Sequence, residues 1–234
     1  MPREPRAVLF DLDDTLYPLQ EFLMSGFRAV AAQVHATWGH GHATVLGVLT
    51  AAYATDRGHE LNVLAEELAL PDGAVATLVA VIQSHRPAIR LSAQARAVLA
   101  ALRQASWRLG LVTNGRPDIQ GRKIAALGVT PLVDAVVIAA EHGSGRGKPE
   151  AAPFLAACDA LGVTPAQVVF VGDDVTCDIA GAHAVGMATI WLPASVSARP
   201  DAAVAPADLI LPSLAGVPAA VGPLLASRWS SHVA

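Results

Sequence analysis

Charged residues, cysteine and long apolar runs are scarce in this chain. Only 15% of its 234 residues are charged, and the net charge of −4 leaves no basic surface suited to nucleic acid. No apolar run approaches the roughly 18–20 residues of a membrane span. We therefore expect neither nucleic acid nor a membrane as a partner.

The chain contains two cysteines, Cys158 and Cys177, which are too few for a disulfide scaffold. Such low cysteine usage is typical of a reducing compartment. The N-terminal residues lead directly into the first predicted strand, so we expect no secretion signal and a cytoplasmic location.

Apolar residues are abundant, at 53% of the chain, which is enough for a substantial core. The length suits one large domain, or a core with a smaller insertion. Short apolar runs alternate with helical patterns, and this alternation predicts an α/β fold with a doubly wound parallel sheet. We expect strands at 7–10, 107–112, 135–138, 168–171, 188–192 and, at an edge, 208–211, with helices at 92–105, 118–127, 151–161 and 179–185.

One long segment breaks the alternation. Apolar residues between positions 18 and 90 recur at helical spacing, with no convincing strand among them. We therefore expect a helical subdomain at 18–90, inserted into a catalytic core made of 1–17 and 91–234. The Ala/Pro-rich stretch 194–206 is expected to be loosely constrained.

The first predicted strand ends abruptly in carboxylates. Asp11 and Asp13 follow a run that is apolar enough to be buried on both faces. Buried ionised groups are costly unless they are paired, hydrogen-bonded or bound to a metal. Ligands of open α/β sheets bind at the carboxyl ends of the strands. The alternative is a purely local role for Asp-Asp-Thr in a turn or at a helix N-terminus.

Polar residues also follow other predicted strands. Thr113 and Asn114 come after the second strand, Asp173 and Asp178 after the fourth, and Lys148 lies in a loop that leads to a helix. Taken singly, Thr-Asn-Gly is an ordinary turn and the lysine an ordinary solvated side chain. If the sheet is parallel, these residues converge with Asp11 and Asp13. Such carboxylates suit Mg²⁺, and the whole set suits phosphoryl transfer.

These four motifs resemble those of the haloacid dehalogenase-like superfamily of phosphohydrolases, and in the same order. The resemblance implies a Rossmann-like core with a helical cap. It implies that Asp11 is the nucleophile, that Asp13 is the general acid and base, and that Thr113 and Asn114 hold the phosphoryl oxygens. It further implies that Lys148 neutralises nucleophile and phosphate. The implied Mg²⁺ site is formed by Asp11, Asp13, Asp173 and Asp178.

Two departures from the family pattern concern the last two motifs. The loop at 143–147 is longer and richer in glycine than the usual lead-in to the lysine. Asp173 and Asp178 are five residues apart, which leaves two roles open for Asp178: direct metal ligand, or hydrogen-bond partner of metal-bound water. We expect Asp174 to cap the following helix.

The resemblance leaves several activities to weigh. Dehalogenases of the superfamily lack the second aspartate, so Asp13 argues against that chemistry. Phosphonate-cleaving members use a cap lysine, whereas Lys123 and Lys148, the two lysines of this chain, both lie outside 18–90. A sugar-phosphate mutase remains open. A phospho-accepting signalling receiver is disfavoured by the long insertion, and a nucleotide-binding P-loop by His142 and Pro149.

The sequence therefore predicts a Mg²⁺-dependent phosphatase of the helical-cap branch, working through an aspartyl-phosphate. Its expected partner is a small phosphorylated metabolite: a nucleotide monophosphate, phosphoglycolate or a sugar phosphate. A monomer or a homodimer fits equally. Arg57 and His59 lie in a glycine-containing loop of the cap and either bind substrate or belong to a solvated loop.

Overall fold

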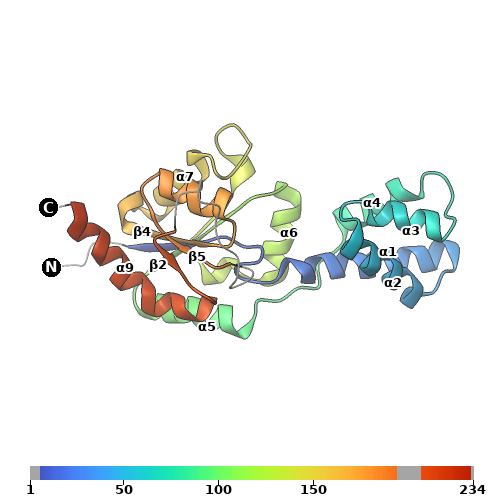
Figure 1. The fold of residues 1–234 in the computed structure, drawn as a ribbon, viewed down its shortest axis with the longest axis horizontal. Coiled ribbons are helices and arrows are strands. Elements are labelled where there is room, and N and C mark those ends of the chain that lie inside the picture. The colour runs from blue at the N-terminus through green and yellow to red at the C-terminus, as the bar shows by residue number, and fades with distance from the viewer. Residues whose placement is uncertain (1–5, 194–206, 233–234) are drawn as a thin grey trace. The chain divides into compact units, whose positions relative to one another are not determined.

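The structure, a computed structural model, describes residues 6–193 and 207–232 (Figure 1). The Ala/Pro-rich stretch 194–206 lies outside these described residues. The chain divides into two compact units. Residues 1–18 and 90–234 form the core unit, and residues 19–89 form the helical unit.

The core unit is built on a six-stranded sheet in which every paired neighbour is parallel, in the order β3-β2-β1-β4-β5-β6. This confirms the predicted α/β class. The strands are β1 (Ala7–Phe10), β2 (Arg108–Thr113), β3 (Ala135–Ile138), β4 (Val168–Gly172), β5 (Ala188–Trp191) and β6 (Leu209–Ile210). Every residue of β1 and β4 is buried, as expected for central strands that are covered on both faces.

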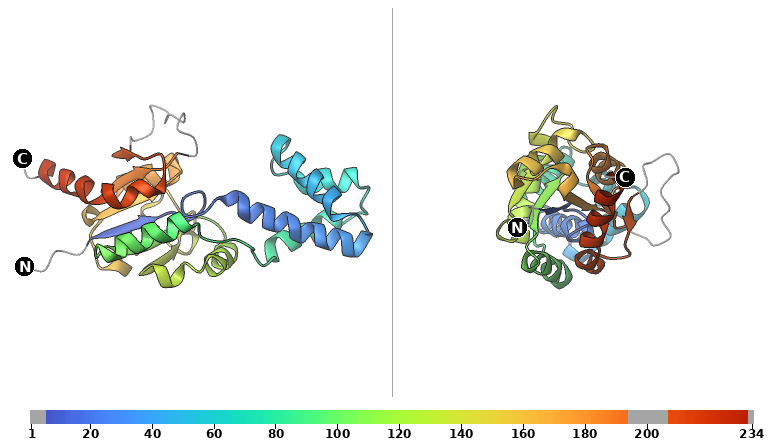
Figure 2. Two further views of the ribbon diagram at one scale, coloured as in Figure 1. Left: turned by 90° about the horizontal axis from the view of Figure 1, so that it is seen from below. Right: turned by 90° about the vertical axis from the view of Figure 1, so that its left-hand side faces the viewer.

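Helices cover both faces of this sheet (Figures 1 and 2). On one face α5 (Ala93–Gln104) packs against β2 and α9 (Val217–His232). On the other, α7 (Ala151–Leu161) packs against β2, β3 and the short α8 (Gly181–Ala184). Phe154 of α7 meets Phe170 of β4 edge-on, with ring centroids 5.2 Å apart, within this apolar layer.

Local sequence signals explain where these helices begin and end. The Ser92 hydroxyl accepts a hydrogen bond from the Ala95 amide, at 3.0 Å, and so caps α5. The helices α6 (Pro117–Leu127) and α7 both end at a glycine in the left-handed region, Gly128 and Gly162. A proline in the first turn of α6 suits a helix start, because its missing N–H has no partner there in any case.

The helical unit contains four helices: α1 (Leu19–Trp38), α2 (His42–Thr55), α3 (Glu60–Glu67) and α4 (Ala74–Ser84). Their apolar faces enclose a separate core, formed by residues such as Phe27, Leu49, Leu64 and Leu78. The Ala88 amide donates to the Ser25 hydroxyl at 2.8 Å, which ties the end of the unit to its first helix.

One predicted helix differs from the structure. The sequence pattern suggests a helix over 179–185, whereas the chain forms a π-helical turn, η4 (Val175–Ala180), followed by α8. The Asp174 carboxylate accepts hydrogen bonds of 2.8 Å from the amides of both Thr176 and Cys177. This cap starts the helical winding four residues earlier than the apolar pattern indicates, and it confirms the capping role predicted for Asp174.

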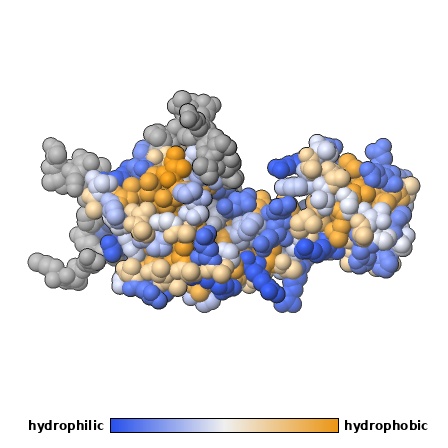
Figure 3. Space-filling model, turned by 60° about the horizontal axis from the view of Figure 1, so that its bottom comes forward, coloured by the Kyte–Doolittle hydropathy of each residue, from blue (hydrophilic) through white to orange (hydrophobic). Residues whose placement is uncertain are grey.

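The surface of the protein is mixed. On the face drawn in Figure 3, hydrophilic residues surround separate hydrophobic patches in both units. Large apolar side chains that are exposed among the described residues are Val79, Val136, Leu155 and Ile210. Among the residues that the structure describes, no helix is long and apolar enough to cross a membrane.

Substitution of Gly181, at the start of α8, tests the packing between α8 and α7. A Cβ atom there would lie 2.7 Å from the Phe154 ring and 2.9 Å from the Pro149 Cα atom, and neither has room to move. Gly181→Ala should therefore lower the free energy of unfolding by about 1–3 kcal/mol, measured by urea denaturation.

Gly121, inside α6, is the matched control, because a Cβ atom there would meet nothing within 4 Å. Gly121→Ala should leave stability unchanged or raise it by up to about 1 kcal/mol, since glycine is unfavourable inside a helix. Equal stabilities of the two variants would contradict the close packing of α8.

Candidate active site

The candidate site lies where three adjacent central strands end. The order β2-β1-β4 brings the ends of these strands together although the sequence separates them widely. Phe10 of β1 pairs with Leu111 of β2 and with Val171 of β4, and the Asp11 amide donates to the Val171 carbonyl at 2.9 Å. Asp11 therefore leaves the sheet between the two neighbouring strand ends.

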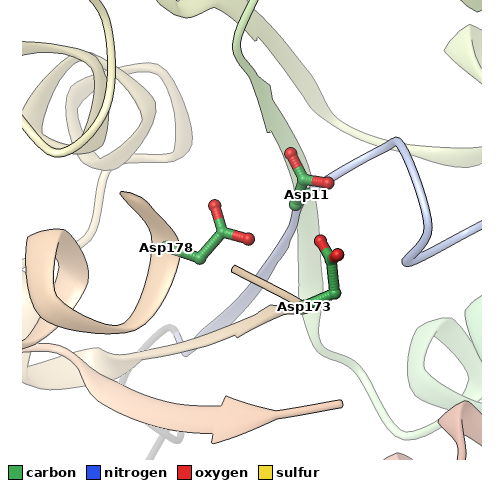
Figure 4. Close-up of side chains that lie close together, drawn as sticks. All are labelled: Asp11, Asp173 and Asp178. Carbon is green, nitrogen blue, oxygen red and sulfur yellow. The ribbon is translucent and has the colours of Figure 1, made fainter. Parts of the chain in front are cut away.

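Three carboxylates form an acid cluster at this edge: Asp11, Asp173 and Asp178. One oxygen atom of each lies within 4.8 Å of the others. Figure 4 shows the three side chains pointing toward one another from separate segments. Burial, reinforced by neighbouring carboxylates, raises the pKa of Asp11 and of Asp173 to about 7. Carboxylate oxygens brought together in this way are the hard ligands that Mg²⁺ prefers.

Asp178 reaches the cluster because η4 starts directly after β4. Its carboxylate accepts a hydrogen bond from the Asp174 amide at 3.2 Å. It also lies against the backbone of Gly172, where any Cβ atom would overlap it. A glycine at the end of β4 is thus what allows this carboxylate to approach the strand.

Lys148 is buried among these carboxylates. Its Nζ atom donates to Asp11 and Asp178 at 2.6 Å each and to the Val112 carbonyl at 3.0 Å. Burial by itself lowers the pKa of this ammonium group, but the carboxylates of Asp11 and Asp178 outweigh burial and raise it. The structure therefore brings Lys148 together with Asp11, Asp173 and Asp178, four residues that the sequence analysis singled out.

Asn114 holds the loop that carries Lys148. Its Oδ1 atom accepts from the Lys148 amide at 2.7 Å, and its Nδ2 atom donates to the Lys148 carbonyl at 3.0 Å. Gly147 makes this contact possible, because it has a φ of +80° and a Cβ atom there would be 2.5 Å from the Asn114 oxygen. The glycines of the loop thus permit a close approach of backbone to side chain.

Asp13 lies outside the acid cluster, although the sequence analysis grouped it with the metal ligands. Its carboxylate accepts hydrogen bonds from the Tyr17 hydroxyl, from Gln120 at 3.0 Å and from Lys123 at 2.8 and 2.9 Å. Gln120 also donates to the Thr113 hydroxyl at 3.2 Å. Two carboxylates that are two residues apart in sequence are therefore held in different environments.

The site residues predicted from the sequence do not include Tyr17, Gln120 or Lys123. One signal was available for the last two. They are three residues apart on the helix that directly follows Thr113 and Asn114, and such a spacing places both side chains on one face.

Arg57 and His59 lie in the helical unit, in the turn between α2 and α3. Both are exposed. His59 Nδ1 is 2.9 Å from Asp56 Oδ1, and the Arg57 guanidinium lies over the Tyr53 ring, 4.7 Å from its centroid. These contacts hold the two side chains within their own unit.

Comparison with known proteins identifies the family. The model of the haloacid dehalogenase-like hydrolases matches residues 5–186. The glyceraldehyde 3-phosphate phosphatase of Methanopyrus kandleri is 30% identical over 198 residues, which are 79% of this chain and 82% of that protein. The ribulose-1,5-bisphosphate 5-phosphatase of Halopiger xanaduensis is 31% identical over 201 residues, 79% of this chain and 83% of that protein.

Solved structures show the same fold. The magnesium-bound HAD-hydrolase YfnB of Bacillus subtilis superimposes with a TM-score of 0.66 at 19% identity, over 94% of this chain and 100% of that one. The family match spans most of the chain, and relatives that are about 30% identical cover four fifths of it. The chain therefore belongs to the haloacid dehalogenase-like hydrolases and is a phosphatase of that family.

Proposed function

We propose that the protein is a Mg²⁺-dependent hydrolase of small phosphomonoesters that works through an aspartyl-phosphate on Asp11. The observation that carries this proposal is the separation of Asp11 from Asp13. Asp11 lies in the acid cluster beside Lys148, whereas Asp13 is held by a different set of donors. Titratable groups in distinct environments can take distinct roles in a reaction.

The residues present fit a divalent cation. Three carboxylates lie close together with one ammonium group, Lys148, to offset them, so two negative charges remain uncompensated when all three are ionised. Asp11, Asp173 and Asp178 would hold the ion. When bound, Mg²⁺ offsets charge on the carboxylates and on the phosphoryl oxygens. The Asp13 carboxylate is left for proton transfer.

In the first step an Asp11 oxygen attacks phosphorus. The bond between phosphorus and the leaving oxygen breaks, its electron pair stays on that oxygen, and Asp13 supplies the proton. In the second step Asp13 takes a proton from the attacking water as the bond between phosphorus and Asp11 breaks. Thr113, Asn114 and Lys148 are the proposed donors to the phosphoryl oxygens.

The proposed substrate class is a small sugar-type phosphate. The relatives named above act on glyceraldehyde 3-phosphate and ribulose 1,5-bisphosphate. Arg57 and His59 are the proposed contacts to the part of the substrate that does not react, because both present nitrogen donors on an exposed loop of the helical unit.

A panel of phosphomonoesters tests the function. Purified protein with Mg²⁺ should release inorganic phosphate from glyceraldehyde 3-phosphate, and sugar phosphates should be preferred to phosphoglycolate and nucleoside monophosphates. Release of halide from a 2-haloacid, together with no phosphate release from any member of the panel, would refute the proposal.

The first prediction from the proposed function concerns metal dependence. EDTA should abolish phosphate release and added Mg²⁺ should restore it, because three clustered carboxylates need a cation. Asp173→Asn should raise the Mg²⁺ concentration that gives half-maximal activity. Asp174→Asn is the matched control, because asparagine also caps a helix N-terminus and Asp174 lies outside the cluster. Undiminished turnover in EDTA would contradict the proposed metal site.

The roles of the two carboxylates give a second prediction. An alkoxide needs its proton in the transition state, where general acid help is worth about 10²–10⁴-fold, whereas nitrophenolate leaves readily as an anion. Asp13→Asn should therefore lose activity on glyceraldehyde 3-phosphate yet release one equivalent of nitrophenol in a burst, with phosphate trapped on Asp11. Asp11→Asn should give no burst.

Rapid-quench kinetics and mass spectrometry of the trapped protein would check this division of roles. If Asp13→Asn loses both substrates equally and no phosphoenzyme accumulates, then Asp13 is not the acid and base.

Substrate recognition by the helical unit gives a third prediction. Arg57→Ala and His59→Ala should each lower kcat/KM for the preferred sugar phosphate by roughly tenfold or more, since a hydrogen bond to a charged group is worth about 1.5–3 kcal/mol. Turnover of acetyl phosphate should persist, because so small a substrate cannot use these contacts. Asp72 lies in another exposed turn of the same unit. Asp72→Ala should therefore change neither kcat/KM for the sugar phosphate nor the turnover of acetyl phosphate. Equal losses on both substrates would contradict a recognition role.

A further inference from the structure

Lys123 is a buried lysine that the reaction described above does not use. Its side chain is only 6% exposed, and its Nζ atom lies 2.8 and 2.9 Å from the two oxygens of Asp13. The ion pair joins α6 to the end of β1 across 110 residues of sequence. It therefore fixes the carboxylate that the proposed function makes the acid and base.

Gln120 extends this contact to the phosphoryl-binding motif. It lies one helical turn before Lys123 and is 2% exposed. Its Nε2 atom lies within hydrogen-bond distance of Asp13, of the Thr113 hydroxyl and of the Asn114 carbonyl, three acceptors that share its two N–H groups. One face of α6 therefore connects the carboxylate of the first motif with both residues of the second.

Stability alone does not account for this arrangement. A buried ion pair loses the hydration of both charges, and apolar residues of similar volume often stabilise a fold as well or better. The pair is therefore weak evidence of a purely structural role. It lies at the reacting end of the sheet, next to Thr113, and this location suggests a role in the chemistry instead.

The hydrogen bonds of Asp13 show what such a role requires. Each carboxylate oxygen offers two lone-pair sites. Oδ1 accepts from Tyr17 and Lys123, and Oδ2 accepts from Gln120 and Lys123, so all four sites are filled. Asp13 can gain a proton only if one donor withdraws. Lys123 contacts both oxygens, so it can release one while it still holds the other.

We propose that Lys123 and Gln120 are positioning residues that orient the Asp13 carboxylate for proton transfer, an inference that rests on the proposed function. Lys123 sets the orientation of the Asp13 carboxylate plane. It maintains this orientation while Asp13 gives its proton to the leaving oxygen in the first step and takes a proton from the attacking water in the second. Gln120 contacts both the Asp13 carboxylate and the Thr113 hydroxyl, and so fixes the carboxylate relative to the residue proposed to bind the phosphoryl group.

The decisive comparison uses two substrates with different needs for a proton. The quantity measured is the single-turnover rate at which the leaving group is released. The two substrates are glyceraldehyde 3-phosphate, whose leaving group is an alkoxide, and p-nitrophenyl phosphate. Lys123→Met keeps the length of the side chain and removes the charge. Its rate with glyceraldehyde 3-phosphate should fall about 10- to 100-fold, the scale of a misplaced catalytic group. Its rate with nitrophenyl phosphate and its KM should change little.

Two further variants complete the series. Lys123→Arg, which retains paired N–H donors, should recover most of the lost rate with glyceraldehyde 3-phosphate. Arg122→Met is the matched control, because Arg122 is the adjacent residue of α6 and pairs with Asp118 at 3.5 Å instead of with Asp13. Its ratio of the two rates should equal that of the wild type.

The outcomes separate a positioning role from a structural one. Equal losses of Lys123→Met on both substrates, or no loss on either, would refute the inference. If Lys123→Met does not fold, Gln120→Met decides in the same way, since it removes the amide and leaves the ion pair. Failure of the proposed function is recognised separately: the wild type would then hydrolyse neither phosphate, or Asp13→Asn would not favour the nitrophenyl substrate.

Discussion

The structure of the site depends on one electrostatic constraint, the gathering of three carboxylates around a single ammonium group. Oxygens of Asp11, Asp173 and Asp178 lie within 4.8 Å of one another. Two like charges about 4 Å apart repel by about 4 kcal/mol at the effective dielectric constant of a protein surface. Lys148, in contact with Asp11 and Asp178, offsets part of this repulsion. The raised pKa values of Asp11 and Asp173, about 7, reflect the burial of these carboxylates and the repulsion among them, and the divalent cation proposed above would relieve that repulsion.

The parallel sheet makes that assembly possible from distant parts of the chain. Because β2, β1 and β4 are neighbours, Thr113 at the end of β2 and Asp11 and Asp173 directly after β1 and β4 lie at one edge. Apolar runs that stop abruptly at polar residues are visible in the sequence, and the rule that such strands end at a common edge needs no coordinates. For this reason the sequence was sufficient to predict the α/β class and the convergence of Asp11, Lys148, Asp173 and Asp178.

The rest of the site could not be read from the sequence, because it depends on the rotation of helices and on close backbone approach. The spacing of Gln120 and Lys123 places both on one face of α6, but it does not show that this face meets Asp13, 110 residues from Lys123. The bonds between Asn114 and the Lys148 backbone depend on the path of a glycine-rich loop. The cap by Asp174 was predicted from the sequence, but the apolar periodicity did not show that η4 starts directly after it. Apolar patterns show which face of an element is buried, but they do not name the polar partner that it meets.

Lysine is scarce in this chain, and its placement supports a division of work between the two aspartates of the first motif. Of 16 basic residues only Lys123 and Lys148 are lysines, and each pairs with one of those aspartates. An ammonium group is compact and has three donors, whereas guanidinium is a flat fork that suits one planar partner. Lys148 fits this description, because its Nζ atom donates to two carboxylates and a carbonyl in different directions. Lys123 pairs with Asp13 and Lys148 with Asp11, so two carboxylates lie two residues apart without sharing an environment, as the proposed roles of nucleophile and acid require.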